Sequence, residues 1–232
     1  MPKQTPILTF VVAGKEYRAK MLTPATTKAL LKPYSAELGH LAAAWNQLQH
    51  NLSSLFTLLV TRENTPISQA IWHATESDFT QRKMLRAVVD VDQAQMPARR
   101  MLTPIQAEEI LWVLNEIDAK LRHKRNNAIH APLVTITGVW DGAVRHRVEA
   151  HFNPHNPRAK PLRGKNLIDE FRTYAAQANA LASYVMKICL AVQRPQHISL
   201  PDRPASPQAH KTRGKPRRGK RKSPDTLASS QA

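Results

Sequence analysis

Arg125 and His130 are the residues of this chain whose types and spacing are best suited to chemistry. They bound the stretch RNNAIH, at the end of a strongly patterned helical segment. A guanidinium offers planar, permanently charged donors to phosphoryl oxygens, and an imidazole can move a proton near neutral pH. These two groups are the minimum needed to cleave RNA without a metal.

In such a cleavage the ribose 2′-OH attacks the adjacent phosphate, which leaves a cyclic phosphate and a free 5′-OH. A base must take the 2′ proton or an acid must protonate the leaving oxygen, and fixed cations must stabilise the added charge. We assign the proton transfer to His130 and the electrostatic role to Arg125. Asn126 would orient the histidine or donate to a phosphate oxygen. At a helix C-terminus the dipole favours cationic His130 by about 0.3–1 kcal/mol, which suits a general acid or an electrostatic stabiliser.

The stretch resembles the Arg-x(4–6)-His motif of the HEPN superfamily, in which the residue after the arginine is often Asn, as Asn126 is here. The resemblance implies a helical bundle over about 37–193. It also implies a metal-independent ribonuclease of a bacterial toxin or defence system, with a neutralising protein partner in the toxin case, or a non-catalytic binding module. A homodimer is implied too, because two motifs meeting at a two-fold axis supply the second histidine that acid–base work needs.

Two other stretches satisfy the same spacing. Arg145 to His151 lies in an expected strand, and Arg203 to His210 lies in an expected tail. The motif at Arg125 differs because it follows an apolar helical seam and carries the adjacent asparagine. A purely structural role is the alternative, since Arg, Asn and His at a helix C-terminus also cap carbonyls and suit the dipole.

The chain is strongly basic and its charge is uneven. It has 232 residues, a formal net charge of +17 and 42% hydrophobic residues, enough for one folded domain and a core. From residue 194 to 232 there are ten Lys or Arg and two Asp, a net +8. This balance indicates a polyanionic partner, with RNA or another nucleic acid favoured over a membrane because the tail has no apolar anchor. The expected RNA-binding residues are Arg122, Lys124, Lys215, Arg217, Arg218, Lys220, Arg221 and Lys222.

Periodicity predicts a mainly α fold, a HEPN-like bundle of about four long helices with one or two β-hairpins. Helices are expected over about 36–60, 66–90, 104–130 and 166–192, with a loop at 91–102. In the second helix Asp78 or Gln81 interrupts the apolar stripe and could face Arg125. Alternation around Ala13-Gly14 and around Asp141-Gly142 predicts hairpins near 7–21 and 134–152. We expect one domain over 1–193 and a disordered basic tail over 194–232.

The remaining chemistry-bearing residues favour simpler roles. Cys189 is the only cysteine, which fits a reducing cytoplasm, and its place on an apolar stripe predicts a core residue. His146, His151 and His155 do not converge as zinc ligands should, so no metal and no other cofactor is expected. No export signal is evident, and no stretch approaches the length of a membrane-spanning helix.

The sequence is therefore compatible with three functions. The first is a dimeric, metal-independent endoribonuclease that uses Arg125 and His130. The second is a non-catalytic HEPN-like module that binds RNA or a protein and uses the basic tail for affinity. The third is a helical interaction protein in which the motif is accidental.

Overall fold

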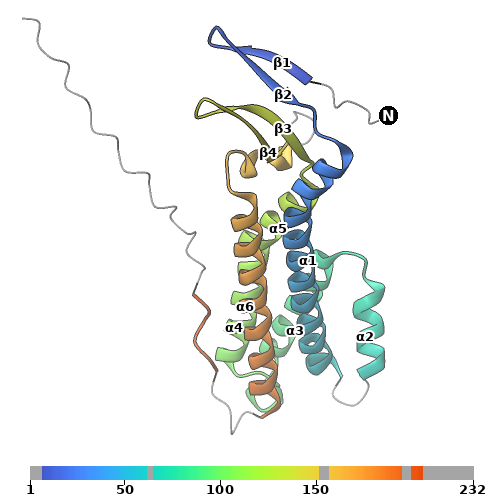
Figure 1. Cartoon of the computed structure of the whole chain (residues 1–232). Helices are drawn as coiled ribbons and strands as arrows, with labels where there is room; N and C mark the ends of the chain where they lie inside the picture. Colours follow the sequence, from blue (N-terminus) through green and yellow to red (C-terminus); the bar gives the residue numbers. More distant parts are fainter. Residues whose placement is uncertain (1–6, 62–64, 152–156, 195–199, 206–232) are drawn as a thin grey trace, which may run out of the picture.

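The longest helix, α1 (Pro24–Val60), runs along most of the molecule (Figure 1). The structure is a computed structural model that describes residues 7–61, 65–151, 157–194 and 200–205. Thr23 caps α1 by accepting a hydrogen bond from the Thr26 amide, and Pro24 takes the first helical position. The expected start near residue 36 is therefore wrong, because the capped turn begins the helix a dozen residues earlier and it continues through Pro33.

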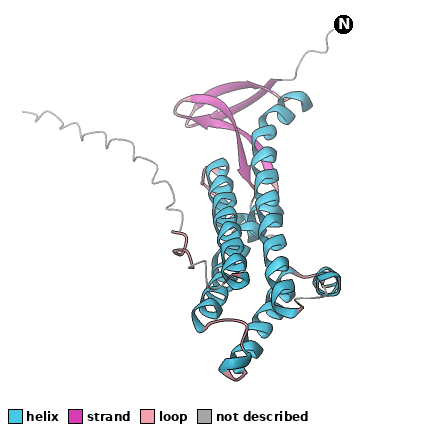
Figure 2. Ribbon diagram, turned by 90° about the horizontal axis from the view of Figure 1, so that it is seen from below, coloured by secondary structure: helices cyan, strands magenta, loops and turns pink. Residues whose placement is uncertain are grey.

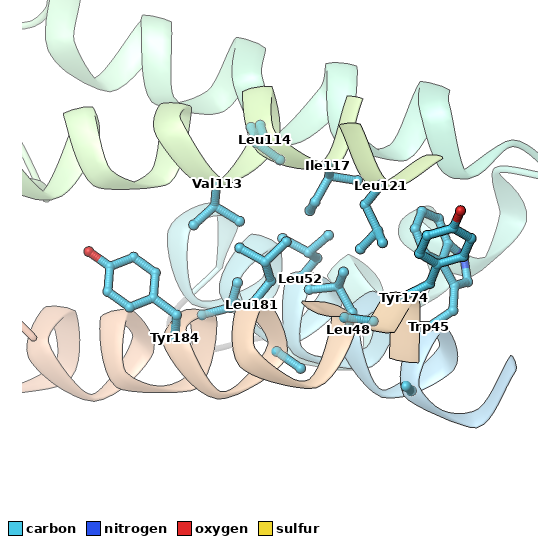
Figure 3. Packing of buried hydrophobic residues seen from close by; sticks show 14 of the residues in the cluster. Trp45, Leu48, Leu52, Val113, Leu114, Ile117, Leu121, Tyr174, Leu181 and Tyr184 are labelled. Atoms are coloured by element: carbon cyan, nitrogen blue, oxygen red, sulfur yellow. The ribbon is translucent and has the colours of Figure 1, made fainter. Parts of the chain in front are cut away.

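Helix α6 (Leu167–Gln193) packs lengthwise against α1 and closes the core with it (Figures 1 and 2). Asn166 caps it, as expected for a helix beginning there. Apolar side chains from α1, α6 and the helical segment 104–130 that faces them interdigitate in this core (Figure 3). Full burial of one such side chain contributes about 1.5–3 kcal/mol to the stability of the fold. They include Leu48, Leu52, Leu114, Ile117, Leu121, Phe171 and Val185, each at most 1% exposed.

Cys189 belongs to this core, as the sequence predicts. It is buried on α6, and burial raises the pKa of its thiol to about 12. The thiol therefore stays protonated at neutral pH and acts as a small apolar group.

Helix α6 also corrects an expectation about membrane spans. By length and composition Leu167–Gln193 could cross a membrane, whereas no such stretch was expected. It is apolar because it packs inside the bundle on most of its circumference, and 61% of its most apolar window is buried.

The single helix expected over about 66–90 is in fact two. Helix α2 (Thr65–Ala74) ends before a short turn, and α3 (Asp78–Ala94) begins at the Ser77 cap, whose hydroxyl accepts from the Thr80 amide. The polar residues that interrupt the apolar stripe are the start of the second helix. The expected loop at 91–102 is shorter, because α3 continues to Ala94, and a 3₁₀ turn, η1 (Pro97–Arg99), lies within the remainder.

The segment that carries the motif is one continuous helical run. Helix α4 (Pro104–Glu116) starts with a capping box between Thr103 and Gln106. A π-helical turn, η2 (Ile117–Leu121), joins it to α5 (Arg122–His130). The run ends at His130 as predicted, because Pro132 disfavours helical geometry at the residue before it.

Two antiparallel hairpins lie at one end of the bundle, with β2 beside β4 (Figures 1 and 2). The first pairs β1 (Ile7–Val12) with β2 (Lys15–Lys20), and the second pairs β3 (Leu133–Trp140) with β4 (Ala143–Ala150). Both hairpins are confirmed. Asp141 and Gly142 have φ of 53° and 73°, the left-handed pair that a tight two-residue turn requires. A 3₁₀ segment, η3 (Pro157–Leu162), follows and packs on α5.

Part of the expected tail returns to the bundle. In the described segment 200–205, Arg203 bonds Glu109 at 2.9 Å and Glu108 at 2.9 Å and lies 5.2 Å above the Trp112 ring. The Tyr184 hydroxyl donates to the same Glu109 carboxylate at 2.6 Å. Residues 200–205 of the expected tail thus contact the bundle, whereas residues 206–232 lie outside the described part.

The Arg203 contact predicts a pH-dependent contribution to stability. The hydrogen bond from Arg203 holds the pKa of Glu109 below its ordinary value of 4.5. A carboxyl with a lowered folded-state pKa stabilises the fold above the ordinary value and loses this effect as pH falls through the lowered one. We expect Arg203→Ala to lower Tm near neutral pH, with the difference from wild type shrinking below about pH 4. Thermal melts across pH test this, with Arg194→Ala as the control, and a difference that is constant with pH would contradict it.

Candidate active site

Arg125 lies half-buried on α5 with its guanidinium above the indole ring of Trp45, 5.2 Å from the ring centroid. Its Nη1 donates to the side-chain oxygen of Asn126 at 2.9 Å. No carboxylate in the described part of the chain forms an ion pair with it. A cation left unneutralised at the edge of the core is suited to hold an anion.

The side chain of Arg125 lines a groove of about 290 Å³ whose walls come from four helices. We call it the Arg125 groove. Helices α1, α2 and α3 supply the remaining walls, and the wall of α2 and α3 includes Asp78 and Gln81 as well as a histidine. The prediction that Asp78 or Gln81 faces Arg125 is thereby supported for both residues. The lining residues are Trp45, Asn46, Gln49, His50, Trp72, His73, Asp78, Gln81 and Arg125.

Hydrogen bonds hold the walls of the groove in place. The Trp45 Nε1 donates to Asp78 Oδ2 at 2.9 Å, which ties α1 to the first turn of α3. Gln81 Nε2 donates to the carbonyls of Trp72 and Thr75, both at 3.0 Å, which ties α3 to the end of α2. These bonds fix the positions of α1, α2 and α3 around the groove.

Several polar atoms in the groove lack a protein partner. Both amide atoms of Gln49 and the Nε of Arg125 are buried without a hydrogen bond to any described residue. Buried polar groups are almost always paired, with protein, water or ligand. Gln49 and Arg125 therefore place polar atoms without a described partner at the wall of the groove.

A second guanidinium, that of Arg82, also lies near this indole. Arg82 is 1% exposed, and its Nε donates to Asp118 Oδ1 at 2.9 Å, while its charge lies 5.8 Å from the Trp45 ring centroid. Burial lowers the pKa of Arg82, and Asp118 opposes that shift. The Asp118 carboxylate therefore compensates the inner cation, and the charge of Arg125 is left for the groove.

His130 lies apart from this groove. It is exposed at the end of α5 and is not among the residues that line the cavity. Residues five apart on a helix point about 140° away from each other, because each step turns the chain by about 100°. The structure thus brings Arg125 and Asn126 together, and it directs His130 away from Arg125 within one chain.

Two histidines that were not predicted from the sequence line the groove together with Arg125. His50 comes from α1 and His73 from the last turn of α2, and both are exposed at the groove. Only the packing of α2 and α5 on α1 brings them near the arginine. The one available signal was local, since His50 and Asn46 lie four apart on the polar face of α1.

The predicted RNA-binding cations of α5 pack against aromatic rings. The Arg122 guanidinium lies 4.7 Å from the Phe79 centroid. The Lys124 ammonium lies 5.6 Å from the Tyr174 ring and donates to Gln177 at 3.3 Å. Both cations are half-buried, so they serve packing at least in part. The six predicted tail residues Lys215, Arg217, Arg218, Lys220, Arg221 and Lys222 lie outside the described residues.

The other histidines do not assemble a metal centre where the chain can be described. His146 hydrogen-bonds with the Thr137 hydroxyl across the β3–β4 pair at 2.9 Å. In the described ranges no cluster of three or more His, Cys, Asp or Glu side chains is placed to hold an ion. His155 lies outside those ranges.

Comparisons of the chain with protein-family models, with curated proteins and with solved structures found no match.

The buried ion pair predicts a large loss of stability on removing one partner. We expect Asp118→Asn to lower the free energy of unfolding by about 3 kcal/mol, because it leaves the Arg82 charge buried and uncompensated. Denaturant unfolding measures this. The matched control is Asp90→Asn on the exposed side of α3, which should change the free energy by less than about 0.5 kcal/mol. Equal effects of the two substitutions would show that the pair does not stabilise the fold.

Proposed function

We propose that this protein is a metal-independent endoribonuclease that holds the scissile phosphate on Arg125. The observation that carries the proposal is the half-buried Arg125 guanidinium. It is stacked on Trp45, unpaired with any described carboxylate, and placed in a groove that two histidines also line. Such a group binds a phosphate through parallel N–H donors and stabilises the charge that develops on it.

The groove contains groups for each part of the reaction. Arg125 and the unpaired Gln49 amide would hold the non-bridging phosphate oxygens. One of His50 and His73 would take the 2′ proton as the 2′-oxygen bonds to phosphorus. The other would protonate the 5′-oxygen as its bond to phosphorus breaks. Asn126 would hold the guanidinium in place, as its 2.9 Å bond to Arg125 indicates.

A homodimer offers a second arrangement for the same chemistry. His130 is exposed at the end of α5, so a two-fold axis could bring His130 of a second copy to Arg125. This is the arrangement that the HEPN resemblance implies, with Arg125, Asn126 and His130 as site residues. A cytoplasmic role in a toxin or defence system, with a neutralising protein in the toxin case, belongs to the same proposal.

One observation favours a non-catalytic function instead. His130 lies outside the Arg125 groove, so within one chain the two motif residues do not share a site. The alternative function is a HEPN-like module that binds RNA or a protein without cleaving it.

The proposal predicts RNA cleavage without divalent metal. We expect the wild type to cut single-stranded RNA in EDTA, to leave cyclic phosphate ends, and to spare DNA of the same sequence. Arg125→Ala should lower kcat/KM by about 10²–10³, because it removes a donor to the charged phosphate. Arg99→Ala, which changes an exposed arginine of η1 that does not line the groove, should have no effect. Absence of cleavage by the folded wild type across several RNAs would favour the binding module.

Histidine substitutions distinguish the two catalytic arrangements. If the groove histidines act, His50→Ala and His73→Ala should each lower kcat by about 10²–10⁴ and His130→Ala should not. If a dimer acts, His130→Ala should be the inactive variant. Mixing it with Arg125→Ala should then restore activity, since the mixed dimer contains one intact Arg125–His130 pair. His123→Ala, an exposed change on the same helix, is the control.

A further inference from the structure

Nearly all the net charge of the described residues lies at the end of the molecule that carries the hairpins. We call residues 7–36, 133–151 and 157–166 the hairpin end. It contains eleven Lys or Arg and three Asp or Glu, a net +8. The rest of the described chain has thirteen Lys or Arg and twelve Asp or Glu, a net +1. The helical body is close to neutral, and the hairpin end is a concentrated positive surface.

The three ranges of the hairpin end are contiguous in space. Strand β2 contacts β4, β4 contacts η3, and α1 contacts both β3 and β4 (Figure 1). Basic side chains are exposed on β2, α1, β4 and η3 and on the segment between η3 and α6. They are Lys15, Arg18, Lys20, Lys28, Lys32, Arg145, Arg147, Arg158, Lys160, Arg163 and Lys165.

Few of these cations are neutralised by the protein. Arg18 pairs with Glu16 at 3.0 Å, and Lys165 pairs with Glu170 at 3.2 Å. Arg145 lies 3.9 Å from the nearest oxygen of Asp141, at the limit of an ion pair. Lys15, Lys20, Lys28, Lys32, Lys160 and Arg163 form no ion pair with any residue that the structure describes. Holding so many like charges together costs free energy, which a polyanion would offset.

A cavity of about 480 Å³ opens within this surface between α1, β4 and the segment before α6. The lining includes the aromatic residue Tyr34, the polar or basic residues His146, Arg147, Lys165 and Asn166, and one acidic residue, Glu149. An aromatic ring beside such groups suits an unstacked nucleotide base, since every base has a flat face and polar edges.

We propose that the hairpin end is an RNA-binding surface, with phosphates on its exposed cations and a nucleotide in the Tyr34 cavity. Only the choice of RNA as the polyanion rests on the proposed ribonuclease function. Phosphate groups are also displayed by DNA and by anionic lipids. RNA fits best because the cations come from four separate elements around a cavity with base-sized features, whereas a lipid surface needs no such cavity.

The test compares two variants of the full chain that lose the same charge. One is Lys28→Gln, Lys32→Gln, Lys160→Gln and Arg163→Gln at the hairpin end. The control is Lys83→Gln, Arg99→Gln, Lys187→Gln and Arg194→Gln on the helical body. All eight residues are exposed, so both variants should fold. Binding to a fluorescent 2′-O-methyl RNA that cannot be cleaved is measured by anisotropy over a salt series, beside the matching DNA and phosphatidylserine vesicles.

We expect the hairpin-end variant to bind this RNA about tenfold or more weakly, with the slope of log K against log salt reduced by about 3, as loss of four phosphate contacts to a single strand requires. The control should keep the wild-type slope. Equal losses in both variants would overturn the proposal, because affinity would then follow total charge. Tighter binding to DNA, or a loss confined to the vesicles, would overturn RNA as the ligand.

The binding result is separate from the cleavage result. A chain that cleaves no RNA but shows the expected change in slope would keep the hairpin end as an RNA surface and remove the nuclease. A chain that cleaves RNA yet binds the 2′-O-methyl strand equally well in both variants would keep the nuclease and remove the surface.

Discussion

The contact of Trp45 with two guanidinium groups is the interaction on which the candidate site depends. The indole is 2% exposed, and Arg82 and Arg125 lie 5.8 and 5.2 Å from its ring. Its Nε1 also binds Asp78, so one side chain joins α1, α3 and α5. Two like charges can share this position because Asp118 compensates the inner one. The apolar seam of α1, which contains Trp45, therefore fixes the arginine that faces the groove.

The distribution of charge divides the described part of the chain into a nearly neutral body and a basic end. The helical body is nearly neutral, and Arg125, a half-buried cation with no ion pair to any described residue, lies at the groove. The hairpin end holds the dense, exposed charge. A few oriented donors in a groove suit catalysis, because they stabilise one developing charge without reorganising. Many exposed lysines suit affinity for a long polyanion, because each contact releases counterions from it.

Local sequence patterns predicted which helices and hairpins form more accurately than they predicted the residues at which these elements begin and end. The seam from Leu41 to Leu59, the hairpin turn at Asp141-Gly142 and the stop at Pro132 each act within a few residues, so they can be read in the sequence. The early start of α1 could also have been read, since Thr23-Pro24 repeats the signal that correctly placed α4 at Thr103-Pro104. The break between α2 and α3 was missed because the apolar stripe resumes after Ser77.

The site itself could be predicted only in part, for a geometric reason. Asn126 neighbours Arg125 in sequence, so their contact could be predicted. His50 and His73 share the groove with the arginine only because three helices pack together, which the sequence does not show. Spacing alone does not place two side chains in one site, because five residues on a continuous helix turn the second about 140° from the first. Because α5 is continuous from Arg122 to His130 and His130 does not line the groove, the sequence spacing that suggested the motif does not by itself define one site.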